Sequence, residues 1–277
     1  MKQRAFAAVA LGAIITGFSG ILIKNMTIPA TSMAFIRTAI PAISMAAYVL
    51  WSRQSFLSRS FKFYGTVSLL NVARMYFFFL AYIYTSIGNA VIMLYTWPIF
   101  AAVFGKIFLH EKISRRQAGL LVASFVGLII VQLDKDFSWG GSDLIGMSAA
   151  LGCAILFALM MIYFKKESAD YSLQEMILYQ NFVPALIFLP FFLWNPFPTS
   201  LDWTLAGTHG IMVGVVAYHL FFFGLRYLKA STHAMIMYLE IVSAVGSSIL
   251  ILGEVLSLNT IIGGAIIILS TLMLRLK

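Results

Sequence analysis

One acidic side chain, Glu240, lies within a long apolar run of the sequence. A charged group in such a run usually faces a cavity or a partner of opposite charge, because leaving water is costly. If the run is one helix, Glu240 shares a face with His233, Met237, Ser243 and Ser247. We expect this face to line a cavity, with Glu240 binding a proton or the ammonium group of a substrate. A permanent ion pair with an arginine is the alternative.

Two arginines, Arg37 and Arg74, also lie within apolar runs, and Asn71 precedes Arg74 by about one helical turn. The planar guanidinium group can bind a carboxylate through two hydrogen bonds, so either arginine could hold an acidic group of a substrate. Either could instead pair with Glu240 or with backbone carbonyls. We weigh the two roles equally for Arg74 and favour a structural role for Arg37.

Aromatic side chains make up 15% of the chain. They could form a cage for a cationic or flat substrate, although most aromatic residues in membrane proteins face lipid or the interface. The candidates for such a cage are Tyr76, Tyr82, Tyr95, Trp97, Tyr218 and Tyr238. Trp97 and Tyr238 are favoured because they stand beside Pro98 and near Glu240. His219 could relay protons, or it could be an ordinary histidine hydrogen-bonded between helices.

The sequence carries no motif of an enzyme that we recognise. HExxH, GxSxG and P-loop patterns are absent, and no two carboxylates lie close together within the apolar runs. The single cysteine, Cys153, excludes an internal disulfide and a cysteine-rich metal site. We therefore expect no enzymatic activity, no cofactor and no bound metal.

The elements that must position these residues follow from composition. The chain has 277 residues, of which 61% are hydrophobic and 10% charged, against about 45–50% and about 25% in soluble domains. Lipid must therefore cover part of it, and a membrane span needs about 20 apolar residues. Backbone groups in lipid must be bonded within the segment, which favours helices. The predicted spans are 5–23, 32–51, 63–84, 88–108, 115–133, 141–164, 173–194, 205–226, 231–252 and 257–275.

Orientation follows from the distribution of lysine and arginine. If the N-terminus lies in the cytoplasm, fifteen of the 19 Lys and Arg residues lie on the cytoplasmic side and two, Lys24 and Lys135, lie outside. The remaining two, Arg37 and Arg74, lie within spans. The fifteen are Lys2, Arg4, Arg53, Arg59, Lys62, Lys106, Lys112, Arg115, Arg116, Lys165, Lys166, Arg226, Lys229, Arg275 and Lys277. We expect both termini in the cytoplasm, a location in the inner (plasma) membrane, and no nucleic-acid partner despite the net charge of +9.

The two halves of the chain match each other at a constant offset of 143 residues. Each half has five spans, an odd number, so the second half must enter the membrane inverted. Inverted repeats are a recurrent plan of secondary transporters, with the substrate site near the midplane. We predict an all-α membrane protein of ten transmembrane helices in two repeats, residues 1–137 and 138–277. The matches include Pro41 with Pro184, Phe78 with Phe221, Tyr84 with Tyr227, Tyr95 with Tyr238, and Glu111 with Glu254.

These features resemble the drug/metabolite transporter superfamily, specifically its EamA group. The resemblance covers the whole chain and lies in the duplicated five-helix unit, in Arg37, and in the stretches PIFAAVFGKIFLHEKISRRQAG (98–119) and YLEIVSAVGSSILILGEVLSLNTIIGG (238–264). Pro98 fits the family pattern, whereas Ile241 stands where the second copy usually has proline, which predicts a smaller bend there. Glu111 and Glu254 are assigned to loop structure. The resemblance implies a central cavity and export or exchange of amino acids or similar metabolites.

We therefore expect a secondary transporter for a small molecule, acting in a lipid bilayer as a monomer or a homodimer, with protons as a candidate coupling ion. An acid and an arginine in one cavity suit a zwitterion such as an amino acid. An acid among aromatic rings also suits an organic cation or an adenosyl compound such as S-adenosylmethionine. A membrane scaffold that transports nothing is the alternative from another class, and it leaves Glu240 and Arg74 without a role.

Overall fold

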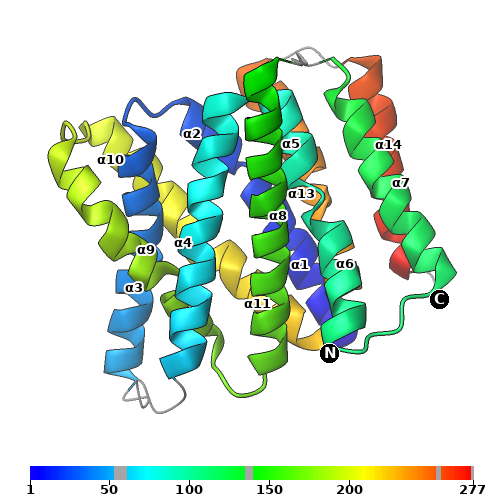
Figure 1. Cartoon of the computed structure of the whole chain (residues 1–277), viewed down its shortest axis with the longest axis horizontal. Coiled ribbons are helices and arrows are strands. Elements are labelled where there is room, and N and C mark those ends of the chain that lie inside the picture. The colour runs from blue at the N-terminus through cyan, green and yellow to red at the C-terminus, as the bar shows by residue number, and fades with distance from the viewer. Residues whose placement is uncertain (53–60, 135–139, 254–256, 276–277) are drawn as a thin grey trace.

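The computed structural model describes residues 1–52, 61–134, 140–253 and 257–275, and all regular structure within them is helical (Figure 1). Residues up to 134 form α1 (Lys2–Gly17), α2 (Ser19–Lys24), α3 (Ala30–Trp51), α4 (Phe61–Tyr84), α5 (Ile87–Leu94), α6 (Trp97–Phe108) and α7 (Arg115–Gln132). Residues from 140 form α8 (Gly141–Glu167), α9 (Leu173–Trp194), α10 (Ser200–His209), the π-helix η1 (Gly210–Ala217), α11 (Tyr218–Tyr227), α12 (Ala230–Met237), α13 (Leu239–Leu252) and α14 (Leu258–Arg275). The predicted all-α class is confirmed.

Some predictions concern residues outside this description. Glu254, expected to serve loop structure, is one of them. The others are cations that the orientation argument used, namely Arg53, Arg59, Lys135 and Lys277.

Nine helical stretches of the described chain are long and apolar enough to cross a membrane, and the shorter apolar helix 258–274 follows as a tenth. Their bounds lie within a few residues of the predicted spans, with one clear difference. The eighth stretch begins at Ser200 rather than 205. The reason is a capping box: the hydroxyl of Thr199 accepts from the backbone N–H of Asp202, and the carboxylate of Asp202 accepts from that of Thr199. Polar residues from the break between two apolar runs thus begin this helix.

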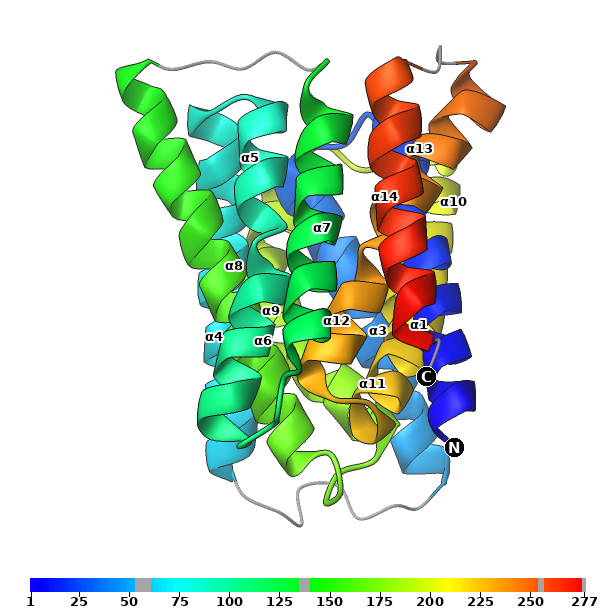
Figure 2. The same cartoon turned by 90° about the vertical axis from the view of Figure 1, so that its right-hand side faces the viewer.

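The helices pack in pairs that join the two parts of the chain. α3 lies against α9, α4 against α8, and α7 against α14 (Figures 1 and 2). α1 packs on η1, α11 and α13, while α8 packs on α4, α5 and α6. The offset of 143 residues makes α3 the counterpart of α9, α7 that of α14, α1 that of α8, and α4 that of η1 and α11. Replacing each helix by its counterpart turns every contact named above into an observed contact. An inverted repeat predicts such a pattern, and the division at residue 137 stays a prediction.

The fourth and ninth stretches are interrupted in the middle. The first of these breaks lies at Tyr95 and Thr96, between α5 and α6, where Pro98 removes one backbone donor. The second lies at Tyr238 alone, between α12 and α13. Its Ile241 keeps an N–H group, which donates to the carbonyl of Tyr238 at 3.1 Å. The interruption without proline is thus the shorter one.

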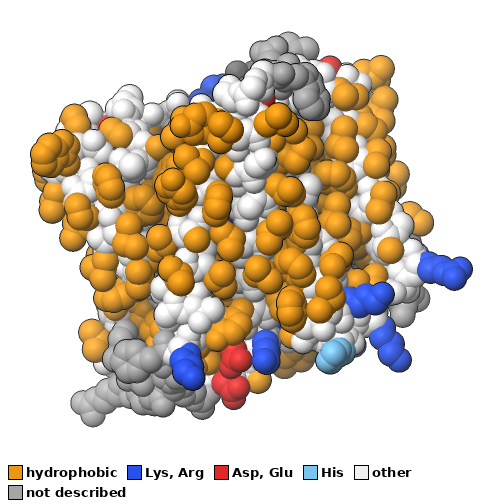
Figure 3. All heavy atoms as spheres, in the orientation of Figure 1, with side chains coloured by type: hydrophobic (Ala, Val, Ile, Leu, Met, Phe, Trp, Pro, Cys, Tyr) orange, Lys and Arg blue, Asp and Glu red, His pale blue; other side chains and the backbone are white. Residues whose placement is uncertain are grey.

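The start of α1 and the end of α14 point toward the same end of the bundle (Figure 2). On the face drawn in Figure 3, most Lys and Arg side chains gather at this end, and hydrophobic side chains cover the flanks. We call this end the basic end and the opposite one the far end. The apolar flanks are the surface that lipid would cover.

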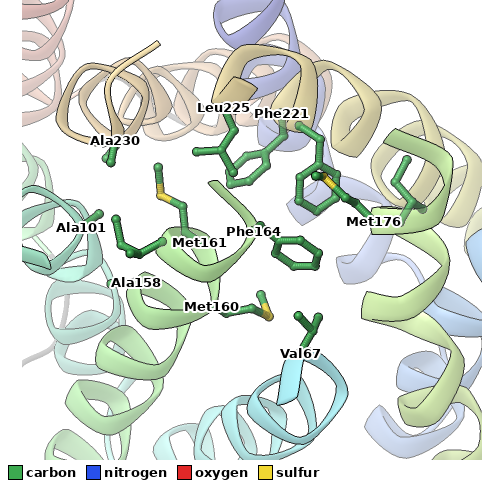
Figure 4. Close-up of a cluster of buried hydrophobic side chains, with 14 of the residues drawn as sticks. Val67, Ala101, Ala158, Met160, Met161, Phe164, Met176, Phe221, Leu225 and Ala230 are labelled. Atoms are coloured by element: carbon green, nitrogen blue, oxygen red, sulfur yellow. The ribbon is translucent and has the colours of Figure 1, made fainter. Parts of the chain in front are cut away.

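A large apolar cluster closes the basic end. It is built from the halves of the helices nearest that end, and it includes Val67, Met160, Phe164, Phe222 and Leu225, all buried (Figure 4). The cluster reaches up to Trp97 and Met237 at mid-depth. The bundle is therefore tightly packed between its middle and its basic end.

Polar contacts tie the same end together. The carboxylate of Glu111, after α6, accepts from the backbone N–H of Ala230 with both oxygens, at 2.8 and 3.1 Å. Lys165 of α8 lies 3.8 Å from that carboxylate and donates to the carbonyls of Leu225 and Leu228. Burial raises the pKa of Glu111, and Lys165 opposes that shift. Glu111 thus joins the ends of α6, α8, α11 and α12.

Glu111→Gln is expected to lower the melting temperature of the detergent-purified protein by roughly 3–8 °C, because Lys165 then lacks its half-buried counterion. Thermal unfolding followed by intrinsic fluorescence measures the change. Glu175→Gln is the control: Glu175 caps α9 from its third position, where glutamine serves equally well. Equal shifts in both variants would contradict the role assigned to Glu111.

Candidate functional site: a charged cavity at mid-depth

A cavity of about 360 Å³ lies at mid-depth, above the apolar cluster, and extends toward the far end of the bundle. Helices from both parts of the chain line it, including α1, α2, α4, α8, α11 and α13. The lining side chains that matter below are Arg37, Arg74, Phe78, Tyr82, Tyr95, Trp97, Cys153, Phe157, Tyr218, Phe221, Met237 and Glu240. Three of them, Arg37, Arg74 and Glu240, carry the charges of the sequence prediction.

Glu240 is the second residue of α13 and lies in its first turn, just after the break at Tyr238. Its side-chain hydrogen-bond partner is Tyr95, and Arg37 lies near enough to act on it electrostatically. Within the part of the chain that the structure describes, Glu240 has no arginine or lysine within 4.0 Å. Among the described residues, the acid is therefore held by a neutral hydroxyl rather than by a basic side chain.

Arg74 is positioned by the helix that carries it. Its Nε donates to the side-chain oxygen of Asn71 at 2.9 Å, and the amide nitrogen of Asn71 donates to the carbonyl of Gln180 at 2.5 Å. The guanidinium carbon lies 5.5 Å from the centre of the Phe157 ring, in a cation–π contact. Asn71 thus orients Arg74 from behind, while Arg74 lines the cavity beside its further hydrogen-bond partner Cys153.

Asn71→Ala is expected to raise the substrate concentration for half-maximal flux by roughly 3- to 10-fold, because Arg74 loses the acceptor that orients it. The maximal rate should change less. The control is Asn181→Ala, since Asn181 is equally buried but donates to Ile177 of its own helix. Concentration dependence of flux in proteoliposomes measures both values. An equal effect in the control would contradict a specific role for Asn71.

Aromatic rings form much of the remaining wall. Trp97 meets Phe157 edge-on, with ring centres 4.8 Å apart. The ring centres of Phe157 and Phe221 are 6.3 Å apart. These rings stand where the cavity meets the apolar cluster of the basic end. The cavity is therefore charged on one side and aromatic at its floor, which suits a small molecule with a polar head and an apolar or flat body.

The structure places seven predicted residues on the cavity wall: Arg37, Arg74, Tyr82, Tyr95, Trp97, Tyr218 and Glu240. Asn71 lies behind Arg74. The other four lie elsewhere. Tyr238 is fully buried, Ser243 donates to the carbonyl of Ile14, Tyr76 points outward with 62% of its surface exposed, and His219 lies 3.5 Å from Gln174.

The prediction that one polar face of the ninth span lines the cavity needs correction. Only Met237 and Glu240 of that face do so. His233 is buried against the carbonyl of Phe221, and Ser247 bonds to its own helix. The prediction assumed one continuous helix, whereas the break at Tyr238 interrupts it.

Several lining residues were not among the predicted site residues, notably Phe157, Phe221 and Cys153. The internal offset carried a signal for one of them. Four pairs related by 143 residues line the cavity together: Arg74 with Ala217, Phe78 with Phe221, Leu94 with Met237, and Trp97 with Glu240. Phe221 could thus have been inferred from Phe78, whereas no such signal marks Phe157.

Comparison with known proteins gives a consistent result. The sequence profile of the EamA-like transporter family matches residues 3–133 and again 144–276. A pseudopaline exporter of Pseudomonas aeruginosa is 26% identical over 90% of this chain and 87% of its own. An S-adenosylmethionine uptake transporter of Rickettsia conorii is 24% identical over 87% of this chain and 81% of its own.

A solved crystal structure has the same fold. It superimposes with a TM-score of 0.88 at 15% identity and covers 100% of this chain and 99% of the solved one. At that identity the likeness concerns the fold alone. Together with the apolar helices, these relatives indicate a multi-pass membrane protein of a transporter family, with small-molecule substrates.

Proposed function

The chain belongs to the EamA-like transporter family, and from this premise we propose that it is a secondary transporter for a small zwitterionic metabolite, an amino acid or a close derivative. It works without enzymatic chemistry, as an exporter or exchanger. The observation that carries the proposal is the cavity wall, where Glu240 and two arginines face one space without a direct ion pair among them in the described chain. Charges left in this arrangement are available to a substrate.

The balance of charge favours a substrate with a carboxylate. Arg37 and Arg74 outnumber Glu240, so the cavity is net positive when the acid is ionised. A free cation would lack a surplus acid to offset these arginines, whereas an amino acid offers a carboxylate to an arginine and an ammonium group to Glu240. The aromatic floor accommodates an apolar side chain.

An adenosyl compound is the second candidate. The edge-on and tilted rings around Trp97 and Phe157 suit a flat base, and Glu240 could face a sulfonium or ammonium charge. One relative bears the name of an S-adenosylmethionine uptake transporter. This molecule also carries an amino-acid group, so the same arginines could serve it.

We assign the basic end to the cytoplasm, in the inner (plasma) membrane, because cations concentrate on the cytoplasmic side of membrane proteins. Both termini then lie in the cytoplasm, and the cavity extends toward the outside. Protons are the proposed coupling ion, with Glu240 as the group that carries them. The working unit is a monomer or a homodimer.

The test is a flux assay in proteoliposomes with radiolabelled phenylalanine, glutamate, choline and S-adenosylmethionine, compared with protein-free liposomes. Saturable flux of an amino acid, with choline excluded, supports the proposal. Saturable flux of choline alone would replace the zwitterion with an organic cation. No flux of any compound above the protein-free liposomes would favour the scaffold alternative.

A further inference from the structure

Tyr95 and Tyr238 occupy the same position in the two halves and touch each other. The offset between them is 143 residues, and each lies at the break of its stretch. The hydroxyl of Tyr238 donates to the backbone carbonyl of Tyr95 at 2.9 Å, with ring centres 6.4 Å apart. Residues related by an internal twofold axis meet only where that axis passes between them. The axis of the two halves thus runs through this pair.

The two hydroxyl groups nevertheless have different partners. The Tyr238 hydroxyl crosses the axis to the backbone of Tyr95, whereas the Tyr95 hydroxyl bonds to Glu240. Strict symmetry would give Tyr95 a bond to the carbonyl of Tyr238. Trp97 holds the position that corresponds to Glu240 and offers no carboxylate. The pair is therefore chemically asymmetric although its backbone positions are equivalent.

The acceptors differ as well. Pro98 has no N–H group, so the carbonyl of Tyr95 is open to the Tyr238 hydroxyl. The carbonyl of Tyr238 already accepts from Ile241 at 3.1 Å. A carbonyl oxygen has two lone pairs, so it can still accept a hydroxyl.

We propose that the two tyrosines exchange roles when the halves exchange conformations. In the state open to the basic end, the Tyr95 hydroxyl donates to the carbonyl of Tyr238 and leaves Glu240. Tyr95 is thus a positioning residue that links the side of opening to the partner of the transport acid. The inference rests on the proposed transporter function, and it assigns to Tyr95 the release of Glu240 when the basic end opens.

The exchange predicts unequal effects of removing each hydroxyl. After the exchange, the Tyr238 hydroxyl would face Trp97, which has no carboxylate to accept a hydrogen bond. Tyr238→Phe therefore deletes a bond from the present state only. Tyr95→Phe deletes one bond from each state. One neutral hydrogen bond changes an equilibrium by about two- to tenfold. Tyr238→Phe should therefore shift the ratio of the two states toward the basic end by that factor, and Tyr95→Phe should shift it less.

Cys153 provides the readout, because it is the single cysteine of the chain and lines the cavity at mid-depth. Only 2% of its surface is exposed, so labelling is slow and the rates of labelling, rather than its end points, are measured. A small charged thiol reagent that does not cross lipid is added to oriented proteoliposomes from one side or the other, and the two labelling rates are compared. The matched controls are Tyr84→Phe and Tyr227→Phe. These tyrosines are related by the same offset but are 40% and 36% exposed.

The expected result is a two- to tenfold shift of the labelling ratio in Tyr238→Phe, a smaller one in Tyr95→Phe and none in the controls. Equal shifts in Tyr95→Phe and Tyr238→Phe, or none in either, would overturn the exchange of roles while leaving alternating access intact. Labelling of the unaltered chain from the far side alone, at every substrate concentration in the flux panel, would instead overturn the transporter function itself.

Discussion

Glu240→Gln lowers saturable flux by about 10- to 100-fold, which is the expected effect of removing one charged partner of the substrate. Glutamine has nearly the same shape as glutamate and can keep a hydrogen bond to Tyr95. It can neither carry a proton nor offset an ammonium group. Flux in proteoliposomes, with protein content matched by quantitative gel, measures the change.

Two control variants make this result specific. Glu240→Asp keeps the charge and shortens the side chain, so it should retain more flux than Glu240→Gln. Glu175→Gln makes the same chemical change at the cap of α9, away from the cavity, and should transport normally. Undiminished flux in Glu240→Gln would mean that Glu240 neither binds the substrate nor carries a proton.

Gly263→Val disrupts the packing of α14 against α7. A β-carbon on Gly263 would meet the carbonyl of Gly127 and lie 2.6 Å from a methyl group of Val131. Small residues let membrane helices approach this closely, and overpacking of a tight contact costs about 1–3 kcal/mol or more. We expect a large fall in folded protein, measured by the monodisperse fraction in size-exclusion chromatography and by the melting temperature.

Gly264 is the matched control, because it is the next residue of the same helix and a β-carbon there meets nothing within 4 Å. Gly264→Val carries the same penalty for valine in a helix, so the difference between the variants reports the contact with α7. Equal yields and equal melting temperatures of the two variants would show that the α7–α14 contact tolerates a larger separation.

The course of the chain through the membrane could be predicted because one strong signal determines it. A run of about 20 apolar residues has few alternatives to a spanning helix. The start of α10 was missed because Thr199 and Asp202 lie in the polar break between two apolar runs and at the same time cap a helix. Hydropathy detects the first property, whereas the second depends on hydrogen bonds.

The cavity was predicted less well, since its wall depends on how helices rotate against one another. Charged residues were informative: Glu240, Arg74 and Arg37 all line it, although Arg37 was given a structural role. Neutral residues were a weaker guide: four of the six aromatic candidates line the cavity, whereas Tyr76 and Tyr238 do not. Tyr76 is one helical turn or less from Arg74 and Phe78, yet it points outward. An aromatic side chain is stable against lipid or protein, so its type alone does not indicate the direction it faces.

The closed basic end makes loading from that side conditional. A substrate that arrives there binds only the molecules whose apolar cluster has opened, so its apparent dissociation constant is the intrinsic one divided by the open fraction. At an open fraction of about 1%, the apparent affinity of the cavity for a substrate from the basic side is a hundredfold lower than its intrinsic affinity. Equilibrium binding to the purified protein then measures mainly the far-side cavity. For the proposed export from the basic end, the substrate concentration needed is set by the free energy of separating those buried side chains.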